Sequence, residues 1–213
     1  MENGLVTDWD SFLAPYEQAV EELKVKLKSI RKQYRDNNAH APIEFITGRV
    51  KTKESILEKA EVRNIDLNRL EEDVQDIAGI RIMCQFVDDI HEVVKLLRAR
   101  NDFKIIIERD YITNKKESGY RSYHLVIEYP VQRIMEEKVI LCEIQIRTLA
   151  MNFWATIEHT LNYKYKGEYP EELHTRLIRA AEAAFLLDNE MSEIREEIKE
   201  AQFYFSDKKK NIN

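Results

Sequence analysis

The run from Glu143 to Arg147 combines the side-chain types of a charged-ligand site with the pattern of a β-strand. Ile144 and Ile146 alternate with Glu143, Gln145 and Arg147. One face of this strand is therefore apolar, and the other carries an acid, an amide and a base. Because a solvated strand face more often carries Thr, Lys or Ser, we expect this polar face to form the floor of a site for charged ligands.

A second acid and several basic residues suit a site for a metal ion and phosphates. Asp76 precedes an apolar run, on a different segment from Glu143. The two carboxylates can share a Mg²⁺ ion, because Mg²⁺ prefers oxygen ligands. Paired salt bridges are the structural alternative for these two acids. The basic side chains can neutralise a polyphosphate, with arginine adding bidentate geometry; they are Arg49, Lys51 and Arg81.

The segment 115–124 is a polar loop that leads into an apolar strand. Its Tyr120 and His124 can stack on a base or contact a ribose. An aromatic residue where a loop meets a strand is more often structural, so spacing alone leaves both interpretations open.

Composition narrows the class of protein. The chain has 213 residues and a net charge of −6, which argues against a general nucleic-acid coat. Both cysteines, Cys84 and Cys142, lie in apolar runs and are expected to be buried hydrophobes. No segment approaches the ~18 consecutive apolar residues of a membrane span, so we expect a cytoplasmic protein.

Apolar periodicity predicts two long helices around a small mixed sheet. Heptad seams run from Trp9 to Tyr34 and from Leu173 to Ala201, and we expect the two helices to pack on each other. Further helices are predicted over 53–63, 90–100 and 149–165, with a short one near 67. Strands are predicted over 43–50, 80–87, 103–107, 124–129 and 139–147. The fold class is therefore α+β, with a mixed sheet of about five strands flanked by helices and long N- and C-terminal helices.

Five motifs of this chain, and their order along it, resemble those of the RelA/SpoT-type alarmone synthetases. The resemblance is strongest to the small, single-domain members of that family, the RelQ type. The matching runs are Thr47-Gly48-Arg49-Val50-Lys51, Asp76-Ile77-Ala78-Gly79-Ile80-Arg81, residues 117–124, Glu143-Ile144-Gln145-Ile146-Arg147-Thr148 and residues 151–159. One such motif alone is weak evidence for a family, but five in the same order are specific evidence. The resemblance covers nearly the whole chain.

The resemblance implies a nucleotidyltransferase-like fold and GTP pyrophosphokinase activity. ATP would donate its β,γ-pyrophosphoryl group to the 3′-hydroxyl of GTP or GDP, giving (p)ppGpp and AMP. A single synthetase domain over 1–213 is implied, with an N-terminal helix (1–36), a catalytic core (42–165) and a C-terminal helix (170–205). The sequence contains no His-Asp dipeptide, so the hydrolase domain of long members is not expected. The 213 residues leave no room for their C-terminal regulatory domains, which are not expected either.

The resemblance also assigns residues. Asp76 and Glu143 would be the catalytic acids and Mg²⁺ ligands, with Glu143 a candidate general base as well. ATP would meet Arg49, Lys51, Ser55 and Arg81, with Arg49 and Arg81 stacking on adenine. GTP or GDP would meet Arg109, Lys116, Tyr120, His124, Gln145, Arg147, Asn152 and Glu158, with Tyr120 stacking on guanine. Long members usually have Gln and Leu where Arg121 and Tyr123 stand, so acceptor preference does not carry over from them.

A basic stripe on the first helix has two interpretations. It can pair with the acidic C-terminal helix around Glu190 to Glu200, or it can form an anion site between subunits. Resemblance to the RelQ type implies a homotetramer whose central cleft binds pppGpp as an activator. The cleft would be lined by Lys24, Lys28, Arg31, Phe45, Thr47 and Asn152.

Two other functions compete with alarmone synthesis. One is an RNA-binding regulator with residual nucleotide binding, suggested by the basic helix and interleaved tyrosines; single-stranded RNA is accordingly a possible partner. The other is a nucleotidyltransferase that acts on tRNA ends. The paired acids and the phosphate-binding set favour chemistry, and the acidic net charge disfavours both alternatives. The sequence does not rank GTP, GDP and GMP as acceptors.

Overall fold

The computed structural model describes residues 6, 8–164 and 170–210, with side chains at 6, 8–161 and 170–204. A five-stranded mixed sheet in the order β1-β2-β5-β4-β3 forms its centre. The strands are β1 (Phe45–Val50), β2 (Ala78–Cys84), β3 (Lys104–Asp110), β4 (Tyr123–Gln132) and β5 (Glu137–Thr148). Only β2 and β5 are parallel; the other neighbours are antiparallel. The predicted fold class is confirmed.

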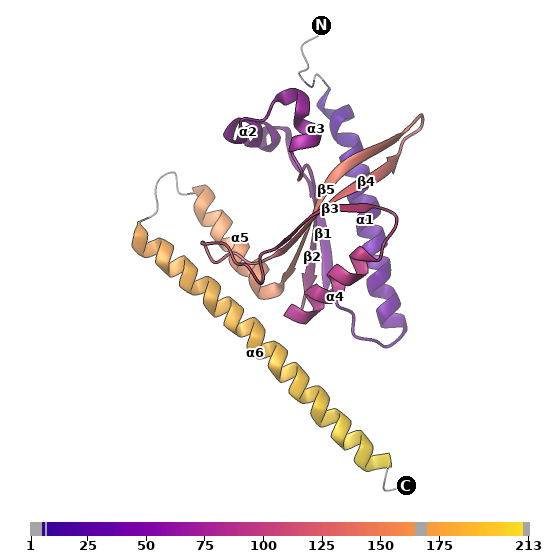
Figure 1. Cartoon of the computed structure of the whole chain (residues 1–213), viewed down its shortest axis with the longest axis vertical. Helices are drawn as coiled ribbons and strands as arrows, with labels where there is room; N and C mark the ends of the chain where they lie inside the picture. The colour runs from indigo at the N-terminus through magenta and orange to yellow at the C-terminus, as the bar shows by residue number, and fades with distance from the viewer. Residues whose placement is uncertain (1–5, 7, 165–169, 211–213) are drawn as a thin grey trace.

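Helices lie on both sides of this sheet. They are α1 (Trp9–Asp36), α2 (Lys53–Arg63), α3 (Leu70–Asp73), α4 (Val87–Arg98), α5 (Leu149–Lys164) and α6 (Glu171–Lys210), with a 3₁₀ turn at Leu67–Arg69 before α3. Figure 1 shows α1 and α4 on one side of the sheet, α5 and α6 on the other, and α2 with α3 beyond one end. Among the described residues, no helix has the length and apolarity needed to cross a membrane.

The helix α1 packs along the sheet because its apolar stripe meets β1 and β2. Tyr16, Leu23 and Leu27 are almost completely buried there. Gly48 allows the close approach, since a Cβ at this position would lie only 2.6 Å from Cγ1 of Val20. The Asp8 side chain caps the helix by accepting from the backbone N–H of Ser11 at 3.1 Å.

The predicted packing of the two long helices on each other is wrong. The N-terminal half of α6 packs on α5, on the opposite side of the sheet from α1, and its C-terminal half runs past the end of the sheet to contact α4 (Figure 1). A heptad pattern identifies an apolar face but does not identify its neighbour, and the sheet provides that neighbour for α1. Much of the apolar face of α6 stays exposed, including Leu186 (65%) and Leu187 (54%).

The predicted boundaries around α4 also shift. The strand that we predicted over 80–87 is β2 and ends at Cys84, and the helix begins at Val87 rather than at 90. The reason is an N-terminal cap: Asp89 accepts from the backbone N–H of Phe86 at 3.3 Å, so the helix starts before its apolar repeat does. The buried state predicted for Cys84 and Cys142 is confirmed.

A buried carboxyl joins α6 to the end of the sheet. Thr148 donates its hydroxyl to Asp188 at 2.5 Å and accepts from the backbone N–H of Met151 at 3.1 Å. Thr148 therefore links the last residue of β5, the first turn of α5 and the middle of α6. Asp188 is only 6% exposed, and burial raises its pKa to about 6.

Candidate functional site

The open part of the sheet on the α5 side is hollowed into a cleft of about 500 Å³, counting space open to solvent. This sheet cleft is lined by Thr47, Gly48, Arg49, Asp76, Gly79, Ile80, Arg81, Glu143 and Gln145. Strand register explains the grouping: Gly79 of β2 lies between Arg49 of β1 and Glu143 of β5. Residues from three segments distant in sequence therefore share one polar face, as the alternation in β5 predicted.

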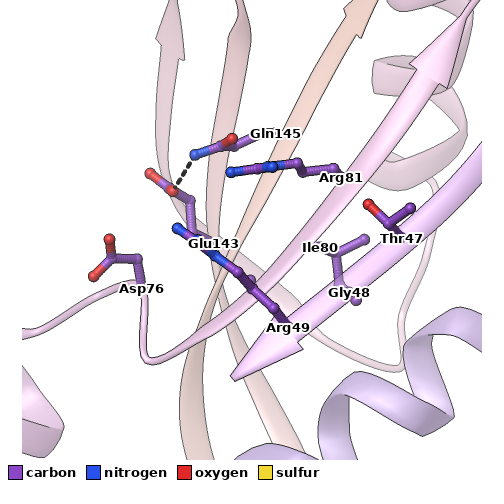
Figure 2. A pocket seen from close by; sticks show the side chains of 9 residues that line it. Thr47, Gly48, Arg49, Asp76, Ile80, Arg81, Glu143 and Gln145 are labelled. Atoms are coloured by element: carbon purple, nitrogen blue, oxygen red, sulfur yellow. Dashed lines mark hydrogen bonds between the residues drawn. The ribbon is translucent and has the colours of Figure 1, made fainter. Parts of the chain in front are cut away.

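Basic and acidic side chains converge in the sheet cleft. Figure 2 shows Arg49 and Arg81 pointing from β1 and β2 toward Glu143, with Asp76 on the loop before β2. Burial lowers the pKa of Arg81, and the neighbouring positive charges of Arg49 and Arg147 lower it further. A cluster of arginines that repel one another in a half-buried cleft favours the binding of an anion.

Asp76 is neutralised by two lysines. Its Oδ1 lies 2.6 Å from Nζ of Lys59, and its Oδ2 lies 3.4 Å from Nζ of Lys51. Lys51 was predicted as a site residue, but Lys59 was missed. Lys59 lies on α2 among alternating charges, where nothing in the local pattern distinguishes it from a solvated residue. Ser55 lies in the first turn of α2, where Thr52 caps the helix by accepting from its N–H.

Glu143 is held by two hydrogen bonds. Gln145 Nε2 donates to its Oε2 at 2.7 Å, and His124 Nδ1 lies 3.1 Å from its Oε1. Burial raises the pKa of this carboxyl, but the hydrogen bond and charge of His124, the hydrogen bond from Gln145 and the charge of Lys59 outweigh burial and lower it to about 2. Glu143 is therefore ionised at neutral pH.

These contacts continue into a closed hydrogen-bonded ring. His124 Nε2 lies 2.8 Å from the Tyr120 hydroxyl, Arg147 donates to that hydroxyl, and Arg147 also donates to Gln145 Oε1 at 2.9 Å. The polar ring thus consists of Glu143, His124, Tyr120, Arg147 and Gln145. All five are predicted site residues, and the structure brings them together beside the sheet cleft.

Of the other predicted acceptor residues, Lys116 and Arg109 adjoin this ring, and Asn152 and Glu158 lie on α5. The Lys116 ammonium lies 4.9 Å from the centroid of the Tyr120 ring. Arg109 pairs with His124 across β3 and β4, and it donates to Gln75 at 3.2 Å. Asn152 and Glu158 are half-buried on α5, and Asn152 Oδ1 is buried without a hydrogen-bond partner. Sequence reasoning missed Tyr111, whose ring meets that of His124 edge-on at 5.3 Å.

The carboxylates fit a magnesium ion as part of a shared coordination shell. Among the described residues no group of three or more His, Cys, Asp or Glu side chains is placed to hold a metal by itself. Mg²⁺ commonly uses one or two carboxylates and completes its shell with water and substrate phosphates. Asp76 and Glu143, both lining the sheet cleft, match that requirement.

The basic stripe of α1 forms a separate groove with the edge of the sheet. This basic groove is lined by Lys28, Arg31, Lys32, Arg35, Phe45 and Ile46. The predicted pairing of the stripe with the acidic C-terminal helix is wrong, because Lys24 pairs with Glu21 at 2.7 Å and Arg31 with Glu44 at 3.2 Å. The cause is that α6 packs on α5 and α4 instead of along α1.

The predicted activator residues are only partly gathered in this groove. Lys28, Arg31 and Phe45 line it, whereas Thr47 lines the sheet cleft and Asn152 lies on α5. Phe45, Thr47 and Arg49 alternate along the same exposed face of β1. The edge strand β1 therefore connects the basic groove with the sheet cleft.

Comparison with known proteins places this site in a family. Residues 48–168 match the family described as a region found in RelA/SpoT proteins. The GTP pyrophosphokinase YjbM of Bacillus subtilis is 64% identical over 202 residues, which cover 95% of each chain.

Solved structures give the same result. Small alarmone synthetase 1 from Bacillus subtilis bound to its product pppGpp superposes with a TM-score of 0.86 at 64% identity, covering 89% of this chain and 97% of the other. The same synthetase bound to AMPCPP superposes with a TM-score of 0.79 at 59% identity, covering 90% and 98%. The chain belongs to the small alarmone synthetases of the RelA/SpoT family.

Proposed function

We propose that this chain is a GTP pyrophosphokinase that transfers the β,γ-pyrophosphoryl group of ATP to the 3′-hydroxyl of GTP or GDP, producing (p)ppGpp and AMP. The observation that carries the proposal is the sheet cleft, where Asp76 and Glu143 lie beside Arg49 and Arg81. Phosphoryl-type transfer depends mainly on positioning and on neutralising phosphate charge, and these four side chains supply both. The pppGpp and AMPCPP complexes of the similar synthetase support it.

The donor half of the site lies on β1, β2 and α2. Arg49 and Arg81 extend from neighbouring strands on one face and would hold adenine between their guanidinium planes. Lys51 and Ser55 would contact the ATP phosphates, and we add Lys59 to this set. In the ligand-free protein Lys51 and Lys59 neutralise Asp76. With Asp76 engaged by a metal ion, both ammonium groups would be available to phosphate oxygens.

Asp76 and Glu143 would hold Mg²⁺, which supplies positive charge to the phosphate under attack. A general base works best with a pKa near the operating pH. The pKa of about 2 for Glu143 therefore supports a metal-binding role over proton abstraction in the ligand-free enzyme.

The acceptor half of the site lies around the polar ring. Tyr120 would stack on guanine, and His124, Lys116 and Arg109 would contact its ribose and phosphates. Gln145, Arg147, Asn152 and Glu158 complete this half. In the ligand-free protein the Tyr120 ring is contacted by Lys116 and Arg147, at 4.9 and 5.0 Å from its centroid. The incoming base would replace at least one of these cations on the ring.

Assembly and activation are further parts of the proposal. Exposed apolar residues on α5 and α6 suit subunit contacts in a homotetramer; they are Phe153, Ile157, Leu161, Leu186, Leu187 and Ile198. The basic groove, repeated by symmetry, would bind pppGpp as an activator. We propose synthesis without hydrolysis, since the His-Asp dipeptide is absent from the sequence. An enzyme that consumes ATP and GTP belongs in the cytoplasm.

The test is incubation of the purified chain with ATP, Mg²⁺ and either GTP or GDP, with the products identified by mass. AMP together with a guanosine penta- or tetraphosphate is the expected result. Its formation should stop when the metal is chelated. Absence of both products from folded protein, at any ratio of the two nucleotides, would contradict the proposed function.

A further inference from the structure

The loop between β3 and β4, residues 111–122, rests on the C-terminal helix α6. Gly119 adopts a left-handed φ of +86°, and a Cβ at this position would lie 2.6 Å from Cβ of Ala181. Two residues later, the Arg121 guanidinium lies 3.7 Å from the centroid of the Phe185 ring. The backbone and the side chains of the loop are therefore fitted to the surface of α6.

One carboxylate of α6 bridges two positions of this loop, Lys115 and Arg121. Glu182 Oε2 accepts from Arg121 Nη2 at 3.1 Å, and Glu182 Oε1 forms an ion pair with Lys115. Lys115 precedes Lys116, and Arg121 follows Tyr120, so both proposed acceptor contacts lie inside the bridged segment. The hydrogen bonds from Lys115 and Arg121 lower the pKa of Glu182, which keeps this carboxylate charged.

The bridged segment is also tied internally. The Gly119 N–H donates to the carbonyl of Lys116 at 2.8 Å, and the Lys116 N–H donates to the carbonyl of Tyr120 at 3.2 Å. Because the turn is closed by backbone bonds and its ends are bridged by Glu182, the Lys116 and Tyr120 side chains are held in a defined relation to each other. The Lys116 ammonium lies 4.9 Å from the Tyr120 ring centroid in this state.

Arg121 is buried more deeply than an ordinary surface salt bridge requires. Its side chain is only 8% exposed, and its buried Nε has no hydrogen-bond partner. Leaving a charged donor buried and unsatisfied costs free energy that an apolar side chain packed on Phe185 would avoid. What Arg121 adds over an apolar side chain is its bond to Glu182. The Lys115 pair is more exposed and contributes less by itself.

We propose that Glu182 is a positioning residue for the acceptor nucleotide, acting from α6 through Arg121 and Lys115 to hold the loop with Tyr120 and Lys116 in its binding arrangement. The inference rests on the proposed function, because Tyr120 and Lys116 are assigned to the acceptor there. Holding a loop in its bound conformation reduces the entropy lost on binding. The effect therefore falls on the acceptor and leaves the ATP site on β1, β2 and α2 unchanged.

The kinetic test compares Glu182→Gln, Arg121→Gln and the double variant in the full-length protein. We expect KM for GTP and GDP to rise about 3- to 10-fold, the range of a charge-assisted hydrogen bond near the surface. KM for ATP and kcat should stay unchanged. The loss in the double variant should be smaller than the sum of the two single losses, because both changes break the Arg121–Glu182 contact. Glu190→Gln, which alters an exposed glutamate on the same helix, is the matched control and should behave as wild type.

A second measurement reports on the loop without requiring activity. Amide hydrogen exchange over residues 111–122 of the ligand-free protein should become faster in Glu182→Gln and stay unchanged in Glu190→Gln. Unaltered exchange and unaltered acceptor KM in Glu182→Gln would overturn the inference, as would equal increases in KM for ATP and acceptor. A wild-type protein that makes no alarmone would refute the proposed function instead, and the exchange experiment would still test the loop contact.

Discussion

Glu143 shows how a single carboxylate is prepared for its role by its neighbours. Its hydrogen bonds to Gln145 and His124 fix both oxygens, and its lowered pKa keeps it charged. Glu143→Gln preserves size but removes the charge, and we expect kcat to fall by at least about 10²-fold, the scale of losing a preorganised electrostatic contact. Circular dichroism should remain that of the wild type. Glu137→Gln, at the exposed start of the same strand, serves as the control. Near-normal turnover in folded Glu143→Gln would remove this residue from catalysis.

Donor and acceptor recognition should separate at two other residues. Arg81→Ala is expected to raise KM for ATP, whereas Tyr120→Ala is expected to raise KM chiefly for GTP or GDP. Loss of a base stack is worth about 1–3 kcal/mol, which corresponds to roughly 5- to 150-fold. Initial rates measured with one nucleotide varied and the other saturating distinguish the two effects. If both variants weakened both substrates equally, the assignment of the two halves would be wrong.

The residues of the polar ring could be predicted from local sequence patterns. Lys59 could not, because its contact depends on how distant segments fold together. Alternation along β5 and the family motifs mark Glu143, Gln145 and Arg147 on one polar face. Lys59 contacts Asp76 only because α2 folds back beside the loop before β2. In the sequence Lys59 is one of several charged residues on a short helix, and its partner is not encoded in any local spacing.

At the scale of elements, periodicity predicted most helices and strands but not how the long helices pack. The bounds of α2 are as predicted, since Thr52 caps one end and Asn64 adopts the left-handed conformation at the other. The apolar stripe of α1 was identified correctly, yet its partner is the sheet and not α6. Packing depends on contacts between distant segments, which a pattern within one helix does not specify.

The attachment of α6 to the sheet should depend on pH through Asp188. Its pKa is raised from 3.8 to about 6, so the folded protein binds this proton more tightly than the unfolded chain does. The contribution of Asp188 to the free energy of unfolding therefore falls as pH rises between about 4 and 6. Asp188→Asn can still accept from Thr148 and carries no charge. We expect it to stabilise the protein by about 3 kcal/mol at pH 7 and to remove this contribution to the pH dependence.

Denaturant unfolding of the wild type and Asp188→Asn at pH 4, 5, 6 and 7 measures this effect. The two proteins should differ most at pH 7 and least at pH 4. A difference that stayed constant across the series would show that the carboxyl charge at position 188 has no part in it.

For the whole molecule, exposed apolar surface and concentrated positive charge predict linked assembly and activation. We expect a tetramer in sedimentation experiments, because α5 and α6 leave a row of apolar residues uncovered. On the basic stripe of α1, Lys24→Ala/Lys28→Ala should abolish activation by added pppGpp and leave basal synthesis intact. Activation requires that pppGpp bind the active arrangement more tightly than the resting one.

Two outcomes would contradict this view at different points. If the protein sedimented as a monomer at working concentration, there would be no cleft between subunits in which pppGpp could bind. Full activation in the double variant would leave the stripe as an ordinary helix face whose charges are partly paired, as Lys24 already is with Glu21.

The parallel pairing of β2 with β5 has a consequence for biosynthesis. The two strands lie side by side at the centre of the sheet, yet α4, β3 and β4 separate them along the chain. A nascent chain that has emerged only as far as β4 has Arg49, Asp76 and Arg81 but lacks Glu143 and the strand that joins the two halves of the sheet. Contacts of such long sequence separation form late. A ribosome-bound fragment would therefore make no alarmone, and production of this potent nucleotide signal would begin only when translation of the sheet is finished.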